Sequence, residues 1–149
     1  MENTLYSLAI GPNNTLYIGS SKGLSLLNLN TMQFTNLSNE EPKNAILTGP
    51  VKDIIFDENK AYWLAIQGAG IAKYRLDGTL IATYKHNNKN SLVANSIKSL
   101  ALDRDGNLWA GSYGEGLSRL SSNGQFQNYF HEADNFKSLG SNIIWKVFV

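Results

Sequence analysis

The sequence repeats one pattern three times. Segments starting at Leu5, Val51 and Ile97 read LYSLAIGPNNTLYIGS, VKDIIFDENKAYWLAI and IKSLALDRDGNLWAGS, so the period is 46 residues. A partial fourth copy, IIWKVFV, begins at Ile143 or Ile144. A fixed period of this length is typical of repeat proteins, in which each unit buries its faces only against its neighbours. The period therefore restricts the fold to an array of similar units.

Each unit contains four short strand signals separated by turn residues. The first strand carries apolar residues on both faces, as expected of a strand that is covered on both sides. The second carries a large aromatic residue and, two positions later, a small one, so that neighbouring sheets can interdigitate. These pairs are Tyr17 with Gly19, Trp63 with Ala65, and Trp109 with Gly111. Four short antiparallel strands followed by a polar connection are typical of a β-propeller blade.

We therefore predict an all-β fold, a β-propeller fragment of about three four-stranded antiparallel blades plus one extra C-terminal strand. The expected blades span about 4–49, 50–95 and 96–142, and the first strand of a fourth blade spans about 143–149. Three blades cannot close a ring, because propellers have roughly four to eight. Both end blades should expose an apolar face and a strand edge. We expect such a fragment to associate as a head-to-tail homodimer of about six blades, closed by a two-fold axis, or to pack against further blades of a parent protein.

The composition excludes several classes of partner. Thirteen basic and 12 acidic residues without a run of either sign give no footprint for nucleic acid or an anionic membrane. No apolar run approaches the roughly 18 to 20 residues that span a bilayer, and MENTLYSLAI does not have the features of a signal peptide. The absence of cysteine excludes disulfides and thiolate metal sites. We expect no membrane contact by this segment.

The third unit, DRDGNLWAGSYGEGLSRL, followed by a closing SLGSN, resembles the two-component regulator propeller repeat. The pattern of that family is roughly D-x-x-G-N-L-W-I-G-T-x-x-G-G-L-x-R, with a closing S-L-x-x-N. The second unit keeps the Trp and the second Gly but lacks the D-x-x-G turn, and the first has Tyr17 in place of the Trp. The resemblance implies part of the extracytoplasmic or periplasmic sensor region of a bacterial hybrid two-component protein of the inner membrane. Such regions often respond to oligosaccharides.

Most residues that could serve in catalysis or in metal or phosphate binding recur at equivalent positions of the units. His86 and His131 each follow a tyrosine by two residues in adjacent units, which favours a structural or exposed role. Asp103 and Asp105 resemble the start of a calcium loop, but no helix and no correctly spaced Glu follow, so we interpret them as turn residues. The glycine-rich turns precede strands, whereas a phosphate loop needs a following helix. We predict no catalytic residue, metal or cofactor.

Loop positions that differ between units remain as candidates for ligand binding, because loops on a rigid scaffold often carry function. The turn between the second and third strands should open on the same face as the blade-to-blade connection. Variable residues of these turns are Lys22, Gln67, Tyr113 and Glu115. Those of the connections are Glu40, Glu41, Lys43, Asn87, Asn88, Asn90, Asp134 and Asn135. Aromatic, amide and carboxylate groups of this kind suit a sugar, whose faces stack and whose hydroxyls need donors and acceptors.

Trp145 is a further candidate. If Ile144 aligns with Ile97, Trp145 takes the place of Tyr6, Lys52 and Lys98 on the inner strand. It would then either line the central channel as a stacking platform or pack against a following blade.

The function expected from the sequence is a ligand-sensing or signal-transducing propeller segment without enzymatic activity. The alternatives are a protein-interaction scaffold and, third, a propeller enzyme similar to the streptogramin lyases. Such an enzyme would need a channel-facing His or carboxylate that other units do not match, and the sequence points to none.

Overall fold

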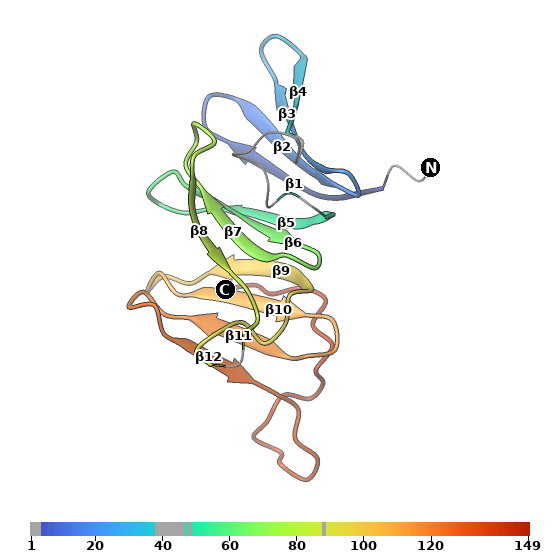
Figure 1. Cartoon of the computed structure of the whole chain (residues 1–149), viewed down its shortest axis with the longest axis vertical. Helices are drawn as coiled ribbons and strands as arrows, with labels where there is room; N and C mark the ends of the chain where they lie inside the picture. Colours follow the sequence, from blue (N-terminus) through green and yellow to red (C-terminus); the bar gives the residue numbers. More distant parts are fainter. Residues whose placement is uncertain (1–3, 38–46, 48, 88) are drawn as a thin grey trace.

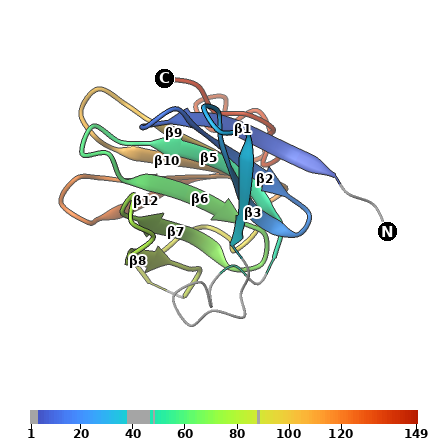
Figure 2. The same ribbon diagram turned by 90° about the horizontal axis from the view of Figure 1, so that it is seen from above.

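The computed structural model describes residues 4–37, 47, 49–87 and 89–149. Among these residues there are twelve strands in three four-stranded antiparallel sheets, and no helix. Figure 1 shows the sheets side by side along the long axis of the molecule, and Figure 2 shows them from above. The predicted fold class is confirmed.

Each sheet is one blade, with its strands in chain order from the inner to the outer edge. Blade 1 consists of β1 (Leu5–Gly11), β2 (Thr15–Ser20), β3 (Gly23–Asn28) and β4 (Gln33–Leu37). Blade 2 consists of β5 (Val51–Phe56), β6 (Tyr62–Ile66), β7 (Gly70–Tyr74) and β8 (Leu80–Tyr84). Blade 3 consists of β9 (Ile97–Leu102), β10 (Leu108–Ser112), β11 (Leu117–Leu120) and β12 (Phe126–Tyr129). The inner strands β1, β5 and β9 contact one another in this order, which fixes the curvature of the arc.

Two apolar cores lie between the blades. One joins blades 1 and 2 around Tyr17, Val51 and Tyr62, and the other joins blades 2 and 3 around Trp63, Ile97 and Leu100. Each blade is too thin to hold a core of its own, so the fold is stabilised by the junctions between neighbours, as expected of a repeat protein.

At each junction the first residue of an inner strand packs on the small residue of the preceding blade. Val51 lies against Gly19, where an added Cβ would be 2.7 Å from the Val51 carbonyl oxygen. Ile97 and Ala65 are both completely buried in the next junction. The predicted small residue thus receives the first residue of the next inner strand, and we call each small residue with its surroundings a seat.

The C-terminal segment, residues 143–149, lies against blade 3. Ile143 forms a bridge with Tyr113, the N–H of Ile144 donates to the Ser112 carbonyl (2.8 Å), and a Cβ on Gly111 would collide with Ile144. Ile144 therefore takes the seat of blade 3 and aligns with Ile97. The segment lies where the extra inner strand was predicted. Its bridge to Tyr113 is an isolated one and belongs to none of the twelve strands.

The two end faces differ. Leu5, Leu8 and Ile10 on β1 are exposed, as predicted for an end blade. On blade 3, in contrast, the C-terminal segment covers the seat. The prediction of an open apolar face is therefore confirmed there only for the outer part of the blade, where Phe130 and Phe136 are exposed.

We expect Gly19→Ala to lower the free energy of unfolding by about 1–3 kcal/mol, because overpacking against backbone cannot be relieved by a rotamer change. Urea unfolding followed by tryptophan fluorescence measures the change. Gly140→Ala is the matched control, because nothing lies within 4 Å of a Cβ at that position. Equal unfolding midpoints for the two variants would contradict the tight-seat interpretation.

Candidate functional site

The turns between second and third strands and the blade-to-blade connections share one face, which we call the connection face. The N–H groups of Gly68 and Gly70 both donate to the Asn95 carbonyl (3.1 Å each). In blade 3, Gly114 and Gly116 bond in the same way to the Asn142 carbonyl, at 3.1 and 3.0 Å. The sequence prediction of a common face is confirmed, and each turn is tied to the end of the connection that follows it.

Tyr113 and Trp145 lie together on the connection face. Their ring centroids are 5.1 Å apart with an interplanar angle of 71°, and both side chains are exposed. The Lys98 ammonium lies 5.3 Å from the Tyr113 centroid. The structure thus joins two of the predicted ligand residues, which we call the aromatic pair, and adds a cation beside them.

The other predicted residues are dispersed over the same face. Glu115 is in the same turn as Tyr113, and its N–H donates to Ser112 Oγ (3.0 Å). Lys22 and Gln67 are in the corresponding turns of blades 1 and 2, and among the described residues no hydrogen bond, ion pair or ring contact joins them to the aromatic pair.

The candidates in the connections are mostly structural where they are described. Asn90 accepts the N–H of Phe126 (2.7 Å), and the N–H of Asn87 donates to Ser91 Oγ (3.0 Å). The Asn135 amide donates to Glu132, and Asp134 has a φ of 67°. Glu40, Glu41, Lys43 and Asn88 lie outside the described residues.

The two histidines make the same contacts in successive connections. Nδ1 of His86 donates to the Leu92 carbonyl (2.8 Å), and Nδ1 of His131 donates to the Leu139 carbonyl (2.7 Å). The backbone N–H of each donates to an asparagine side chain, at 2.7 and 2.6 Å. Both rings therefore brace a connection, in agreement with the structural interpretation.

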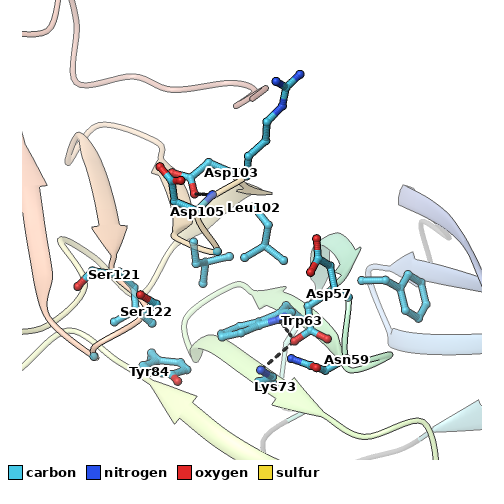
Figure 3. Close-up of a pocket in the computed structure, with 17 residues that line it drawn as sticks. Asp57, Asn59, Trp63, Lys73, Tyr84, Leu102, Asp103, Asp105, Ser121 and Ser122 are labelled. Atoms are coloured by element: carbon cyan, nitrogen blue, oxygen red, sulfur yellow. Dashed lines mark hydrogen bonds and ion pairs between the residues drawn. The ribbon is translucent and has the colours of Figure 1, made fainter.

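A cavity of about 740 Å³ opens on the opposite face, between blades 2 and 3 (Figure 3). Three turns form its rim: the turn after β5, the turn after β9 and the turn after β11. Trp63, Lys73 and Tyr84 line it from blade 2, and Leu102 lines it from blade 3. The sequence prediction placed no ligand site on this face.

Asp57 organises the blade 2 side of the cavity. Its carboxylate accepts the N–H of Ala61 (2.9 Å), Nε1–H of Trp63 (3.1 Å) and the Lys73 ammonium (2.8 Å). Partial burial raises the pKa of Asp57, but the Lys73 ammonium and the two N–H donors outweigh it and hold that pKa below its ordinary value. Lys73 also lies 4.5 Å from the Trp63 ring, which stacks on Tyr84. The carboxylate is thus committed to a network rather than available as a base.

Asp103 plays the same part in blade 3. It accepts Nε1–H of Trp109 (2.8 Å) and the N–H groups of Asp105 (3.1 Å) and Asn107 (2.8 Å). The Trp109 bond is the largest of the effects that lower the pKa of Asp103, to about 2. The interpretation of these aspartates as turn residues is confirmed. Among the described residues, no three His, Asp or Glu side chains are grouped as a metal site would need.

Blade 1 replaces this polar set with an apolar one. Gly11, Tyr17 and Leu26 occupy the positions of the Asp, the Trp and the cation. A Cβ on Gly11 would be 2.6 Å from the Phe56 ring, which meets Tyr17 edge-on at 5.0 Å. Aromatic rings therefore fill the place between blades 1 and 2 that corresponds to the cavity. Between blades 2 and 3, Leu102 stands where Phe56 would be, and the space is open.

The sequence analysis missed two differences between the units, although both are visible when the units are aligned. The first is the cation opposite the Trp, Lys73 or Arg119, which blade 1 lacks. The second is Asp53, a carboxylate at a position that is Ser7 in blade 1 and Ser99 in blade 3. Asp53 is therefore a carboxylate that the other units do not match, and its bonds to Leu100 and Lys146 place it between blades 2 and 3.

Asp53 is buried and fully engaged. Its Oδ2 accepts the N–H of Leu100 and the Lys146 ammonium, both at 2.9 Å, and its Oδ1 accepts the N–H of Ile54 at 3.1 Å. These contacts tie blade 2 to blade 3 and to the C-terminal segment. The hydrogen bonds and the ion pair of Asp53 therefore give this residue a structural role.

Three four-stranded blades joined through their inner strands define the chain as a segment of a β-propeller. Residues 91–114 match the family described as Two component regulator propeller. The matched residues cover the connection into blade 3 and the first two strands of that blade. No curated protein matches the chain.

Among solved structures, the extracellular domain of the putative hybrid two component system BT4673 from B. thetaiotaomicron is 26% identical with a TM-score of 0.72. The match covers 97% of this chain and 19% of that one. The corresponding domain of BT3049 from the same organism is 19% identical with a TM-score of 0.77, covering 97% and 20%. PorZ of Porphyromonas gingivalis, an essential surface component of the type-IX secretion system, is 24% identical with a TM-score of 0.56, covering 76% and 17%. The latter two show the fold alone.

The chain spans about a fifth of the length of these structures. Within the described ranges, no helix is long and apolar enough to cross a membrane.

We expect the stability difference between the wild type and Asp103→Asn to depend on acid pH. Because the folded pKa is about 2, below the unfolded value, the charged carboxylate stabilises the fold above roughly pH 4 and this contribution disappears as the pH falls toward 2. Urea midpoints of the two proteins should therefore differ at pH 7, keep that difference down to about pH 4, and converge near pH 2. A difference that stays constant down to pH 2 would contradict the assignment.

Proposed function

We propose that the chain is a segment of the ligand-sensing propeller of a bacterial two-component regulator and that it is not an enzyme. The observation that carries the proposal is the family match at 91–114, together with 26% identity over 97% of the chain to an extracellular domain of a putative hybrid two component system. The extracellular position of that domain supports a location outside the inner membrane, in the periplasm or beyond. The full engagement of Asp53, Asp57 and Asp103 in structural bonds supports a binding role over a catalytic one.

We place the ligand contact on the connection face, at the aromatic pair. Tyr113 and Trp145 present exposed rings at an angle to each other, with Lys98 beside Tyr113 and Glu115 in the same turn. Aromatic faces can stack on the apolar faces of sugar rings, and charged side chains provide donors and acceptors for hydroxyls. An oligosaccharide is therefore the ligand class that suits this surface, with Lys22 and Gln67 on the same face as more distant contacts.

The position of Trp145 suggests how binding could be transmitted. Trp145 belongs to the C-terminal segment, which is bonded to blade 2 through Lys146 and Asp53 and to blade 3 through Val147 and Ser99. A ligand held between Tyr113 and Trp145 bridges blade 3 and this segment. Binding would thus fix the position of the segment relative to both blades and pass a change in geometry to the domain that follows.

The second candidate function is a protein-interaction scaffold, which the exposed apolar residues Leu5, Leu8 and Ile10 on β1 favour. A glycan array and a pull-down with the same tagged protein separate the two functions. Glycan binding favours the sensor, whereas specific partner capture without glycan binding favours the scaffold.

We expect Trp145→Ala to weaken binding of any glycan found on the array by about tenfold, because ring stacking contributes on the order of 0.5–1.5 kcal/mol beyond the area that it buries. Isothermal titration calorimetry measures the affinity. Phe136→Ala is the matched control, because Phe136 is a fully exposed ring outside the pair.

A further variant, Ser122→Trp, is designed to fill the cavity on the opposite face. Unchanged affinity for Trp145→Ala combined with lost affinity for Ser122→Trp would move the ligand site to that cavity and refute the aromatic pair as the site.

A further inference from the structure

The two junctions inside the chain use the same strand positions in opposite ways. Between blades 1 and 2, blade 2 contributes the rings of Phe56, Tyr62 and Tyr74, which form one cluster with Tyr17 of blade 1. One period later, blade 3 has a leucine at each of these three positions: Leu102, Leu108 and Leu120. All three leucines line the cavity between blades 2 and 3. The cavity therefore lies where the first junction holds aromatic rings.

Asp57 prevents the second junction from closing in the same way. In the first junction, the Phe56 ring lies so close to Gly11 that a Cβ there would be 2.6 Å from it. Asp57 takes the place of Gly11 in blade 2. Its carboxylate is held by Nε1–H of Trp63 and by the Lys73 ammonium. A ring at position 102 in the pose of Phe56 would collide with this side chain, so the opening follows from the residues of both blades.

The blade 2 wall of the cavity is a fixed aromatic surface (Figure 3). Trp63 stacks on Tyr84 with ring centroids 5.8 Å apart, and Asp57 holds its indole N–H. A wall that is already ordered takes up a ligand with little further loss of conformational entropy. The volume of about 740 Å³ lies in the range of roughly 300–1,000 Å³ that small-molecule sites occupy. Between this wall and the leucines of blade 3, a planar aromatic ring is the apolar group that suits the space.

The mouth of the cavity carries more negative than positive charge. Four acidic and two basic side chains line the cavity: Asp57, Glu58, Asp103, Asp105, Lys73 and Arg104. The pairing of Asp57 with Lys73 leaves three carboxylates and one guanidinium. Glu58 and Asp105 are exposed, and within the described ranges neither carboxylate has an ion pair. An excess of one charge at a cleft attracts ligands of the opposite charge, so a cationic substituent is favoured over an anionic one.

We propose that the cavity between blades 2 and 3 binds a small aromatic cation. The planar ring lies between Trp63 and the leucines of blade 3, and the ammonium or amidinium group lies at the acidic mouth. The ligand thus supplies the kind of ring that blade 2 itself supplies in the first junction. It differs in class from the oligosaccharide proposed for the connection face, and it binds on the opposite face. The proposal does not rest on the sensor assignment.

The test is an NMR titration of the isotopically labelled full chain, because its three tryptophans lie at separate places. Trp63 lines the cavity, and Trp145 belongs to the aromatic pair. Phenethylamine should shift the indole N–H signal of Trp63 saturably and leave that of Trp145 unchanged. It should bind at least about threefold more tightly than cyclohexylethylamine, its saturated analogue, and hydrocinnamate, its anionic counterpart. The variants Trp109→Phe and Trp145→Phe assign the signals.

Variants that fill the cavity should abolish this binding. Leu120→Tyr gives blade 3 the ring that blade 2 has at Tyr74 and should lower the affinity for phenethylamine by about tenfold or more, because the new ring occupies the place of the ligand. Ser122→Trp fills the cavity from an exposed residue of its rim and should have the same effect without a change in the core. Leu8→Phe, at an exposed position of β1, is the control and should leave the affinity unchanged. Circular dichroism verifies that each variant is folded.

The role of the charged mouth is tested separately. Glu58→Gln combined with Asp105→Asn should reduce the preference for phenethylamine over hydrocinnamate, because it removes two exposed carboxylates from the rim. The matched control is Glu132→Gln combined with Asp134→Asn, which makes the same change of charge in the connection after blade 3 and should leave the preference as it is.

Several outcomes would overturn the proposal. They are the absence of a saturable shift at Trp63, equal affinity for phenethylamine and either of its analogues, and wild-type affinity in a folded Leu120→Tyr or Ser122→Trp protein. A shift confined to Trp145 would also overturn it and would place the aromatic cation at the aromatic pair. Glycan binding at the aromatic pair is measured by the signal of Trp145 alone, so either site can fail without the other.

Discussion

The contact of one apolar side chain with one small residue is repeated at every junction and holds the blades in register. Val51 on Gly19, Ile97 beside Ala65 and Ile144 on Gly111 are the same contact at successive positions. Since side-chain positions alternate along a strand, a shift of one residue would turn these apolar residues away from the seat. The seat thus determines which residues of the next inner strand face the junction. The positions of the turns in that next blade follow from this placement.

The same scaffold position can either close or open a junction, depending on three residues of one blade and on whether the next inner strand brings Phe56 or Leu102 to them. Where the set is Gly11, Tyr17 and Leu26, the rings of Tyr17, Phe56 and Tyr62 fill the space, and burial raises the pKa of Tyr17. Where the set is Asp57, Trp63 and Lys73, the carboxylate neutralises the cation and fixes the indole, and a cavity remains. The polar set gives a junction in which the Asp57 carboxylate pairs with the Lys73 ammonium, and the apolar set gives one that aromatic rings fill. Variation between units at these positions therefore decides which junction of this chain contains a cavity.

The period predicted the strands because it reflects local requirements that each unit must meet alone: turn residues, alternation and the large–small pair. The connection face followed as well, since it depends only on the order of strands. The cavity did not, because Asp57 and Asp103 are also ordinary turn residues, and whether the space beside them is open depends on the side chains of the neighbouring blade. The Asp53–Lys146 pair joins residues 93 positions apart and depends on how inner strands converge, which no local pattern contains. Likewise, the sequence pointed to Tyr113 and Trp145 separately, and only the position of the C-terminal segment against blade 3 brings them into contact.

The C-terminal segment places two roles on adjacent residues. Trp145 belongs to the aromatic pair on the connection face, and Lys146 bonds to the buried Asp53. Because both contacts require that Ile144 remains in its seat, the proposed ligand contact and the Asp53–Lys146 pair depend on the same position of the segment. A ligand that binds Tyr113 and Trp145 together must favour the seated position, and by linkage seating must strengthen the binding of that ligand by the same factor. The physical basis of this coupling is the contact of Ile144 with Gly111, which sets the distance between the two rings.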